Sequence, residues 1–375
     1  MRKLRCLCVV GTRPNFIKIA PILRAINKKL QVKLLHTGQH YDNLMDKIFF
    51  KELSIKKPDF NLGVGSGSHS YQLAKITLGV ERILKKYKPH IVIVVGDVNS
   101  TLASALVAKR MNIPIAHVES GLRSFDHSMP EETNRILTDH ISQLLFTTEK
   151  SANQNLKNEG IKLNRIYFVG NVMIDSLFYH LNKKITPQKI IQRLFPKKKF
   201  ELVKNNYALL TLHRPQNVDK KEQLKFILNE IKKISDKFKI KILFPIHPRT
   251  KRNIKRFNLQ NILNNKRIIC LSPIGYIDTI NLIYNSKFIL TDSGGMQEEA
   301  AALKKPCITL RQSTERPITI KYGSNFVVGS NSSKLNKAVK TIMSNTRIRY
   351  GRIPFWDGKT AERIVKTVMK HLKEA

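Results

Sequence analysis

The sequence predicts an α/β protein built from two doubly wound domains with parallel sheets, and three observations support this fold class. The chain has 375 residues, which suggests two or three domains at roughly 150 residues each. Short, continuously apolar stretches alternate with longer stretches of helical period, as expected for buried parallel strands joined by helices. The alternation occurs twice, on either side of a basic segment at residues 182–206 that lacks a clean strand period.

In both halves of the chain the predicted strands are short apolar runs that end at polar or glycine-containing loops. In the first half they are residues 4–10, 32–36, 91–96, 113–118, 144–147 and 166–169, with helices such as 16–29, 71–86 and 101–111 between them. In the second half they are residues 208–212, 241–246, 268–271, 288–291 and 307–310, with helices such as 220–238 and 295–303. We therefore predict a first domain at residues 1–181, a connection at 182–206 and a second domain at 207–357.

The composition is that of a globular protein with a strong excess of basic residues. Sixty-seven Lys and Arg against 27 Asp and Glu give a formal net charge of +40. A nucleic-acid-binding protein is one interpretation of this charge. The lysines are spread along the whole chain, however, and no zinc finger, basic zipper or aromatic ribonucleoprotein motif accompanies them. We therefore expect solvated charge, no specific nucleic-acid partner and an added attraction for anionic ligands.

Targeting and cysteine patterns favour a cytoplasmic protein. No apolar run approaches the roughly 18 residues that span a bilayer, so no membrane association is expected. The basic start Met1-Arg2-Lys3 is followed by an apolar stretch that is too short for a signal peptide. The four cysteines are single residues within apolar runs, without the spacing of a metal site or a disulfide framework.

Polar motifs follow the predicted strands with a regularity that predicts a ligand site. Doubly wound folds bind ligands beyond the carboxyl ends of their strands. The motifs at these positions are Gly11-Thr12-Arg13-Pro14, Gly96-Asp97, His117-Val118-Glu119-Ser120-Gly121, His213-Arg214-Pro215, His247-Pro248-Arg249 and Asp292-Ser293-Gly294-Gly295. Their shared placement predicts one large cleft between the two domains.

Two of these motifs are suited to an anionic ligand. Ser293, Gly294 and Gly295 follow a strand and open a helix, where glycines allow close approach and free backbone amides favour an anion. The alternative is a simple helix cap by Ser293. At the first motif, Arg13 and Lys18 flank a helix start and could hold a diphosphate, although solvated cations at an ordinary strand-to-helix turn would leave the same pattern.

The same strand ends carry groups that could transfer protons. The single titratable residues at strand ends are Asp97, Glu119 and His213. Glu131 and Glu132 lie at a predicted helix start, where an acidic residue can also serve only to offset the helix dipole, and we expect one of the two to do so. Carboxylates gathered around one cleft can act as acid and base. His117 precedes Glu119 by two residues, and both a packed and a catalytic histidine remain open for it.

Taken in order, these motifs resemble the non-hydrolysing UDP-N-acetylglucosamine 2-epimerase family. The matching segments are GTRPNFIK, HTGQHYD at 36–42, GDVNST at 96–101, HVESGLRS at 117–124, PEETNR at 130–135, HRPQNVD at 213–219, TDSGGMQEEA at 291–300, TERP at 314–317 and FWDGKTAERI at 355–364. The resemblance covers essentially the whole chain. It implies two Rossmann-like domains of the glycosyltransferase-B type, a cytoplasmic homodimer without a cofactor or metal, and a C-terminal helix at about 358–375 that packs back on the first domain.

The resemblance also implies roles for individual residues. Proton transfer is assigned to Asp97, Glu119 and Glu131, and contact with the leaving diphosphate to His213. Substrate-binding roles fall on Arg13, Lys18, Ser293, Gly294 and Gly295 at the diphosphate, Glu299 at the uridine ribose, Tyr276 near the uracil and Arg316 in a loop facing the nucleotide sugar. The implied substrate is UDP-N-acetylglucosamine, and the implied reaction inverts carbon 2 of its sugar.

Chemistry restricts how such an inversion can proceed. The hydrogen on carbon 2 has no adjacent carbonyl, so its direct removal to give a carbanion is too costly. Elimination of UDP to a 2-acetamidoglucal, followed by addition of UDP with protonation from the other face, avoids this and requires separate acid and base groups. The alternatives are a 2-epimerase of a modified UDP-sugar and a nucleotide-sugar glycosyltransferase of the same fold.

Overall fold

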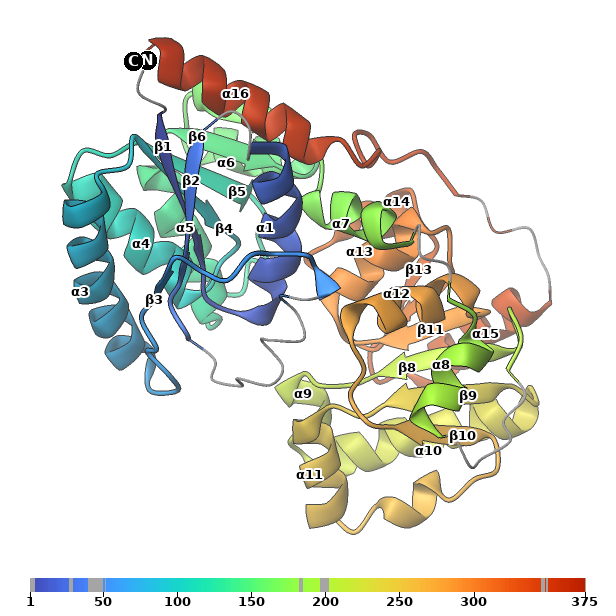
Figure 1. The fold of residues 1–375 in the computed structure, drawn as a ribbon. Helices are drawn as coiled ribbons and strands as arrows, with labels where there is room; N and C mark the ends of the chain where they lie inside the picture. Colours follow the sequence, from blue (N-terminus) through green and yellow to red (C-terminus); the bar gives the residue numbers. More distant parts are fainter. Residues whose placement is uncertain are drawn as a thin grey trace. The chain divides into compact units, whose positions relative to one another are not determined.

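The computed structural model describes residues 4–26, 30–39, 50, 52–181, 185–195, 202–344, 348 and 350–374, with the backbone alone for Arg13. The chain folds as two compact units (Figure 1). The first contains Met1–Tyr179 and Pro354–Ala375, and the second contains His180–Ile353. Each has a parallel sheet with helices on both faces, so the predicted α/β fold class is confirmed.

The described residues of the first unit form a seven-stranded parallel sheet in the order β3-β2-β1-β4-β5-β6-β7. Its strands are β1 (Arg5–Val10), β2 (Gln31–His36), β3 (Phe60–Asn61), β4 (Ile91–Val95), β5 (Ile115–Ser120), β6 (Leu144–Thr147) and β7 (Ile166–Phe168). All five residues of β4 are buried because β4 lies inside the sheet with helices on both faces. This explains its unbroken apolar sequence, IVIVV.

The helices of the first unit cover the two faces of this sheet. They are α1 (Arg13–Ile26), α3 (His69–Tyr87), α4 (Asn99–Arg110), α5 (Pro130–Ile141), α6 (Lys150–Asn158), α7 (Val172–Leu181) and α16 (Thr360–Glu374), with the 3-10 helix η1 (Leu163–Arg165). Leu7 and Val9 of β1 join a core cluster with residues of α3 and α4. The C-terminal helix α16 packs against α1, and Asp175 of α7 accepts hydrogen bonds from the first amides of α16, Thr360 N at 3.2 Å and Ala361 N at 2.7 Å.

The described residues of the second unit form a six-stranded parallel sheet in the order β10-β9-β8-β11-β12-β13. Its strands are β8 (Tyr207–Thr211), β9 (Lys241–Pro245), β10 (Ile268–Leu271), β11 (Phe288–Thr291), β12 (Cys307–Thr309) and β13 (Asn325–Val327). Its helices are α8 (Pro187–Leu194), α9 (Pro215–Val218), α10 (Lys221–Lys237), α11 (Pro248–Arg256), α12 (Tyr276–Asn285), α13 (Gly294–Ala302), α14 (Pro317–Lys321) and α15 (Ser332–Met343), with the 3-10 helix η2 (Gln260–Leu263).

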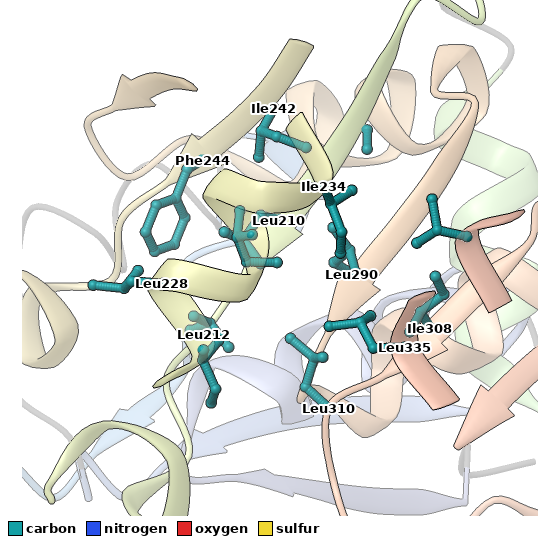
Figure 2. Close-up of a cluster of buried hydrophobic side chains, with 14 of the residues drawn as sticks. Leu210, Leu212, Leu228, Ile234, Ile242, Phe244, Leu290, Ile308, Leu310 and Leu335 are labelled. Carbon is teal, nitrogen blue, oxygen red and sulfur yellow. The ribbon is translucent and has the colours of Figure 1, made fainter. Parts of the chain in front are cut away.

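Two hydrophobic clusters hold these helices to the second sheet. On one face, Leu228 and Ile234 of α10 and Leu335 of α15 pack on alternate residues of β8, β9 and β11 (Figure 2). On the other face, residues of α8, α12 and α13 form a second cluster. Ile190 and Ile191 of α8 are fully buried there, so part of the segment that we predicted as a connection, 182–206, belongs to the core of the second unit.

The order of each sheet reverses direction beside its first strand. In the first sheet this point lies between β1 and β4, and in the second between β8 and β11. Ligands of doubly wound folds bind at such switch points, beyond the carboxyl ends of the strands. The residues that follow these strands are Gly11-Thr12, Gly96-Asp97, Leu212-His213 and Asp292-Ser293. Among the described residues, no helix is long and apolar enough to cross a membrane.

Asp292 joins the carboxyl ends of β8 and β11. Its fully buried carboxylate accepts backbone hydrogen bonds from His213 N at 3.0 Å and Arg214 N at 2.9 Å, and a side-chain bond from Asn217 Nδ2 at 3.1 Å. The ring Nδ1 of His213 lies 3.1 Å from Asp292 Oδ1. Burial alone would raise the pKa of Asp292, but the bonds and charge of His213 and the backbone amides outweigh it and lower the pKa.

We predict that Asp292→Asn destabilises the protein by about 1–3 kcal/mol at pH 7, because an amide NH₂ then faces donors that need an acceptor. Since the folded-state pKa of Asp292 is lowered, its contribution is complete above the ordinary value of about 3.9 and is lost as the pH falls through the folded value. Chemical denaturation of both proteins at pH 7 and below pH 4 measures this difference. Asp236→Asn, in a half-exposed pair with Arg267, is the control and should change stability by less than about 1 kcal/mol. An equal loss at both pH values would contradict the assignment.

Candidate functional site

The loop between β1 and α1 is fixed by Asn15. Its Oδ1 accepts hydrogen bonds from Gly11 N at 3.2 Å and Thr12 N at 3.0 Å, and its Nδ2 donates to Val95 O at 3.0 Å. A side chain at Gly11 would place its Cβ 1.9 Å from Ser100 Oγ, so only glycine fits against the start of α4. Arg13 opens α1, but its side chain lies outside the described part of the chain, and its role at the diphosphate stays a prediction.

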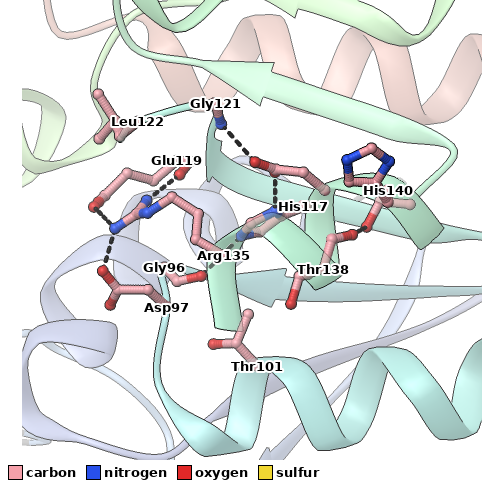
Figure 3. A network of polar contacts seen from close by, with 12 residues as sticks. Gly96, Asp97, Thr101, His117, Glu119, Gly121, Leu122, Arg135, Thr138 and His140 are labelled. Atoms are coloured by element: carbon pink, nitrogen blue, oxygen red, sulfur yellow. Dashed lines mark hydrogen bonds and ion pairs between the residues drawn. The ribbon is translucent and has the colours of Figure 1, made fainter. Parts of the chain in front are cut away.

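Beside this loop, two acidic and two basic side chains form one cluster, most of which Figure 3 shows. Lys18 Nζ forms an ion pair with Glu119 Oε2, and Arg135 Nη2 forms one with Asp97 Oδ2. The same Arg135 Nη2 lies 3.5 Å from Glu119 Oε1, and Arg135 Nη1 donates to the backbone oxygen of Glu119 at 2.5 Å. The structure thus brings together three of the predicted site residues, Asp97, Glu119 and Lys18.

Most charged groups of this cluster are buried from solvent. Lys18, Glu119 and Arg135 are buried, and the Asp97 side chain is about one quarter exposed at 28%. An isolated buried charge is costly, but here two cations balance two carboxylates. Sequence analysis did not single out Arg135, although it lies in the quoted PEETNR segment. Lys18 contacts Glu119 in this structure, and its role at the diphosphate stays a prediction.

The backbone at Glu119 departs from a regular strand. Glu119 has a positive φ of 69°, which is uncommon for a residue other than glycine. The pairing of β5 with β6 shifts register between Val118 and Ser120, as at a β-bulge. Bulges re-aim a side chain, and strained backbone of this kind is concentrated at functional sites. The distortion therefore points to Glu119 as a functional residue.

Glu131 and Glu132 differ sharply in their surroundings. Glu132 is buried, and it accepts hydrogen bonds from Ser124 N at 2.8 Å, Ser124 Oγ at 2.9 Å and Phe125 N at 3.0 Å. It therefore shapes the loop after β5. Glu131 is exposed on the first turn of α5, and within the described residues it makes no ion pair with the cluster of Asp97 and Glu119. Its catalytic role stays a prediction.

In the second unit, the start of α13 has the features expected of an anion site. Ser293 is the N-cap residue, but its side chain makes no capping hydrogen bond with the helix in the described structure, which disfavours the simple-cap interpretation. Gly294 and Gly295 are the first residues of α13, and a Cβ at Gly294 would lie 2.9 Å from Glu315 Oε1. A carboxylate of the chain itself therefore lies against this helix start.

Several arginines surround that carboxylate. Glu315 pairs with Arg311 at 2.6 Å and with Arg214 at 3.6 Å. Burial would raise the pKa of Glu315, but the charges of Arg316, Arg311 and Arg214 outweigh it and lower the pKa to about 2. The positive charge around the start of α13 is thus strong enough to keep a largely buried anion ionised.

The remaining predicted binding residues also lie around α13. Tyr276 opens α12 and is buried; its pKa is raised well above the ordinary value by burial, and further by the charge of Glu299 and the hydrogen bond with it. The structure therefore brings Tyr276 and Glu299 together. Arg316 Nε lies 2.9 Å from Glu298 Oε1 and so ties the TERP segment to α13. Sequence analysis had quoted Glu298 in a motif without giving it this role.

A metal site is not evident in the described part of the chain, where no group of three or more His, Cys, Asp or Glu side chains is arranged to hold an ion. The first unit offers carboxylates paired with cations, and the second offers a helix start, arginines and His213.

Comparison with known proteins agrees with these features. Residues 24–369 match the family model described as UDP-N-acetylglucosamine 2-epimerase. The chain is 48% identical to a UDP-N-acetylglucosamine 2-epimerase of Methanocaldococcus jannaschii over 96% of this chain and 97% of that protein. It is 36% identical to a UDP-2,3-diacetamido-2,3-dideoxy-D-glucuronate 2-epimerase of Pseudomonas aeruginosa over 98% of this chain and 100% of that protein.

Solved structures give the same answer. The crystal structure of the M. jannaschii UDP-GlcNAc 2-epimerase in complex with UDP-GlcNAc and UDP matches with a TM-score of 0.88 at 46% identity, covering 98% of this chain and all of that one. The two units, each with a parallel sheet, of seven and six strands in the described residues, are therefore those of the glycosyltransferase-B type of fold. By family model, sequence identity and fold, this chain belongs to the UDP-N-acetylglucosamine 2-epimerase family of isomerases.

Proposed function

We propose that this protein interconverts UDP-N-acetylglucosamine and UDP-N-acetylmannosamine by elimination and re-addition of UDP. The observation that carries the proposal is the buried cluster in which Asp97 and Glu119 share Arg135. Two carboxylates held a few ångströms from a common cation can serve opposite faces of one carbon. The family match supports this choice over a glycosyltransferase, which has no comparable need for paired proton-transfer groups.

The proposed steps balance without an oxidant or a reductant. A carboxylate removes the proton from carbon 2, and the electron pair of that C–H bond forms the carbon 1–carbon 2 double bond. The bond from carbon 1 to the diphosphate oxygen breaks in an anti elimination, and its electrons leave with UDP. In the return step, a diphosphate oxygen of UDP attacks carbon 1 of the 2-acetamidoglucal while a second acid delivers a proton to the opposite face of carbon 2. Asp97, Glu119 and Glu131 are the proposed groups for these transfers.

Stabilisation of the leaving diphosphate is the task that we assign to the second unit. The loop of Ser293, Gly294 and Gly295, with the backbone amides of its two glycines, and the ring of His213 would receive the negative charge as it develops. The ionised Glu315 supports this, because its carboxylate already lies against Gly294 among arginines. Arg13 and Lys18 would add positive charge from the first unit.

The rest of the nucleotide is assigned to residues around α12 and α13. We place the uridine ribose at Glu299, the uracil near Tyr276 and the nucleotide sugar at the loop of Arg316. The contact between Tyr276 of α12 and Glu299 of α13 supports a shared site, since both side chains are buried where these two helices meet.

A modified UDP-sugar is the second candidate substrate. The P. aeruginosa relative, at 36% identity over nearly the whole chain, is named for a diacetamido-uronic acid sugar. The relative from M. jannaschii, at 48% identity, is named for UDP-N-acetylglucosamine, and this favours the plain sugar. Offering both substrates to the purified protein in the assay below compares the two candidates directly.

We predict that wild-type protein incubated with UDP-N-acetylglucosamine in deuterated water gives the manno epimer with deuterium at carbon 2. Proton NMR monitors the reaction. In the same assay Asp97→Asn, Glu119→Gln and Glu131→Gln should each lower turnover by at least about a hundredfold, the low end for a lost acid or base. Each variant should still bind UDP, because the nucleotide is assigned to the second unit.

Glu81→Gln is the matched control, since Glu81 is a partly exposed partner of Lys85 on α3 and should leave turnover unchanged. Failure of the wild type to form the manno epimer would overturn the proposed reaction. Near-normal turnover in one carboxylate variant would remove that residue from the catalytic set.

We also propose that the protein is a homodimer that associates through the outer face of α3, α4 and α5. These helices pack side by side (Figure 1). Large apolar side chains are exposed on all three: Tyr71, Leu78, Leu106 and Leu137. An apolar patch of this kind, on helices that already cover a sheet, is typical of a protein–protein interface. A second copy of the chain is the occupant that the family resemblance implies.

We predict that Leu78→Glu combined with Leu106→Glu converts the dimer to a monomer, because two charges would be buried in the interface. Light scattering after size-exclusion chromatography should give about twice the chain mass of 43.1 kDa for the wild type and the single mass for the variant. Leu163→Glu is the control, since Leu163 is equally apolar and 68% exposed but lies on η1, outside this face. A wild type that is monomeric at micromolar concentration would refute the proposal.

A further inference from the structure

A buried chain of hydrogen bonds connects the two segments that carry Asp97 and Glu119 (Figure 3). His117, in the middle of β5, is fully buried. One ring nitrogen, Nε2, lies 2.8 Å from Gly96 O, and the other, Nδ1, lies 2.7 Å from Asp139 Oδ1. The second carboxylate oxygen of Asp139 accepts a hydrogen bond from Gly121 N at 3.0 Å. The chain thus begins one residue before Asp97 and ends two residues after Glu119.

Both partners of His117 are acceptors. Gly96 offers a carbonyl oxygen, which cannot donate. Asp139 is held as a carboxylate, because its Oδ2 accepts from Gly121 N at 3.0 Å and lies 2.8 Å from Arg123 Nη2, while its Oδ1 faces the ring. A neutral imidazole has one N–H and one lone pair, so one of its two short contacts would place a lone pair against an oxygen. Both contacts are hydrogen bonds only when both nitrogens carry protons.

Charged side chains surround the ring and its partner Asp139. Arg123 Nη2 lies 2.8 Å from Asp139 Oδ2 and 2.7 Å from Glu159 Oε2. Arg165 lies near Asp139 and donates to backbone oxygens at the end of α5. On the same strand, Glu119 is already balanced by Lys18 and Arg135.

We propose that His117 is a positioning residue for the epimerisation: doubly protonated and paired with Asp139, it sets the spacing between Asp97 and Glu119. The inference rests on the proposed function of those two carboxylates. Gly96 and Gly121 both have positive φ, 72° and 76°, so each segment turns sharply beside its carboxylate, and a fixed bond at each turn is what holds it. The role resembles that of the aspartate in a Ser-His-Asp triad, which orients a histidine without reacting itself.

The first arm of the test measures the proton positions in the wild type and needs no variant. With ¹⁵N-labelled histidine at pH 7.5, both ring nitrogens of His117 should show a bonded hydrogen by NMR, in protein with and without UDP. His117→Gln identifies the signal by its disappearance. A single protonated nitrogen on His117 would overturn the proposal.

The second arm measures the kinetic consequence. His117→Gln and Asp139→Asn keep similar shapes but cannot make all the bonds of the chain, because the glutamine side chain has one amide group and the asparagine NH₂ cannot accept from Gly121. Each should lower kcat at least tenfold while KM for UDP-N-acetylglucosamine and the affinity for UDP stay within threefold. His36→Asn, at a buried histidine on β2 of the same sheet, is the control for mere loss of packing and should leave kcat within threefold.

The outcomes separate the two proposals. If the wild type forms no manno epimer, the proposed function fails, while the NMR result still decides the state of His117. If the wild type is active and either chain variant keeps kcat within threefold, or if His36→Asn loses as much as His117→Gln, the positioning role is refuted. A variant that does not fold, as judged by circular dichroism and thermal denaturation, is replaced by the other, since each breaks the same chain.

Discussion

The buried contact of Arg135 with Asp97 and Glu119 is the interaction on which the first unit's site depends. A doubly wound sheet brings the carboxyl ends of β4 and β5 side by side, and each of these ends carries an acidic residue. Two carboxylates so close and so poorly solvated would repel each other without a cation. Arg135 contacts both carboxylates from α5, and Lys18 contacts Glu119 from α1. Side chains from two helices thus neutralise the carboxylates at the ends of β4 and β5.

In the proposed function, the second unit receives a negative charge. Asp292 fixes the ends of β8 and β11 through bonds to the amides of His213 and Arg214, which sets where the His213 ring lies. The start of α13 beside it offers free amides, and arginines around Glu315 add positive charge. In the proposed function, the first unit supplies the proton-transfer groups, and the second unit receives the negative charge of the departing UDP.

Sequence patterns predicted the strands except β3 and β13, because buried parallel strands are continuously apolar and ligand loops follow their ends. The two missed strands are short and lie at the edges of the sheets, so they lack such an apolar run. They could not show the partners that come from another element. Arg135, Asp139 and Glu298 act through contacts with residues tens of positions away, and such pairing depends on helix rotation and sheet register. The segment 182–206 was predicted as a connection because it is basic and lacks a clean strand period. Its short helix α8 nevertheless buries Ile190 and Ile191 in the second core.

The different environments of Glu131 and Glu132 are a further case. Both are acidic residues in the first turn of one helix, and the pattern predicted that one of them only offsets the helix dipole. Glu132 has a different structural role, since it makes three hydrogen bonds to the loop after β5. The bulge that aims Glu119 is likewise invisible in the sequence, since nothing in HVESG marks a register shift.

The most direct test of this account is the rate of deuterium incorporation at carbon 2 by Arg135→Lys compared with wild type. Lysine keeps the charge but cannot hold Asp97, the Glu119 carboxylate and the Glu119 backbone oxygen at once, as the planar guanidinium does. If this shared cation sets the geometry of the two carboxylates, the exchange rate falls at least about tenfold, equivalent to about 1.4 kcal/mol, while UDP binding is unchanged. An exchange rate within threefold of wild type would contradict the account.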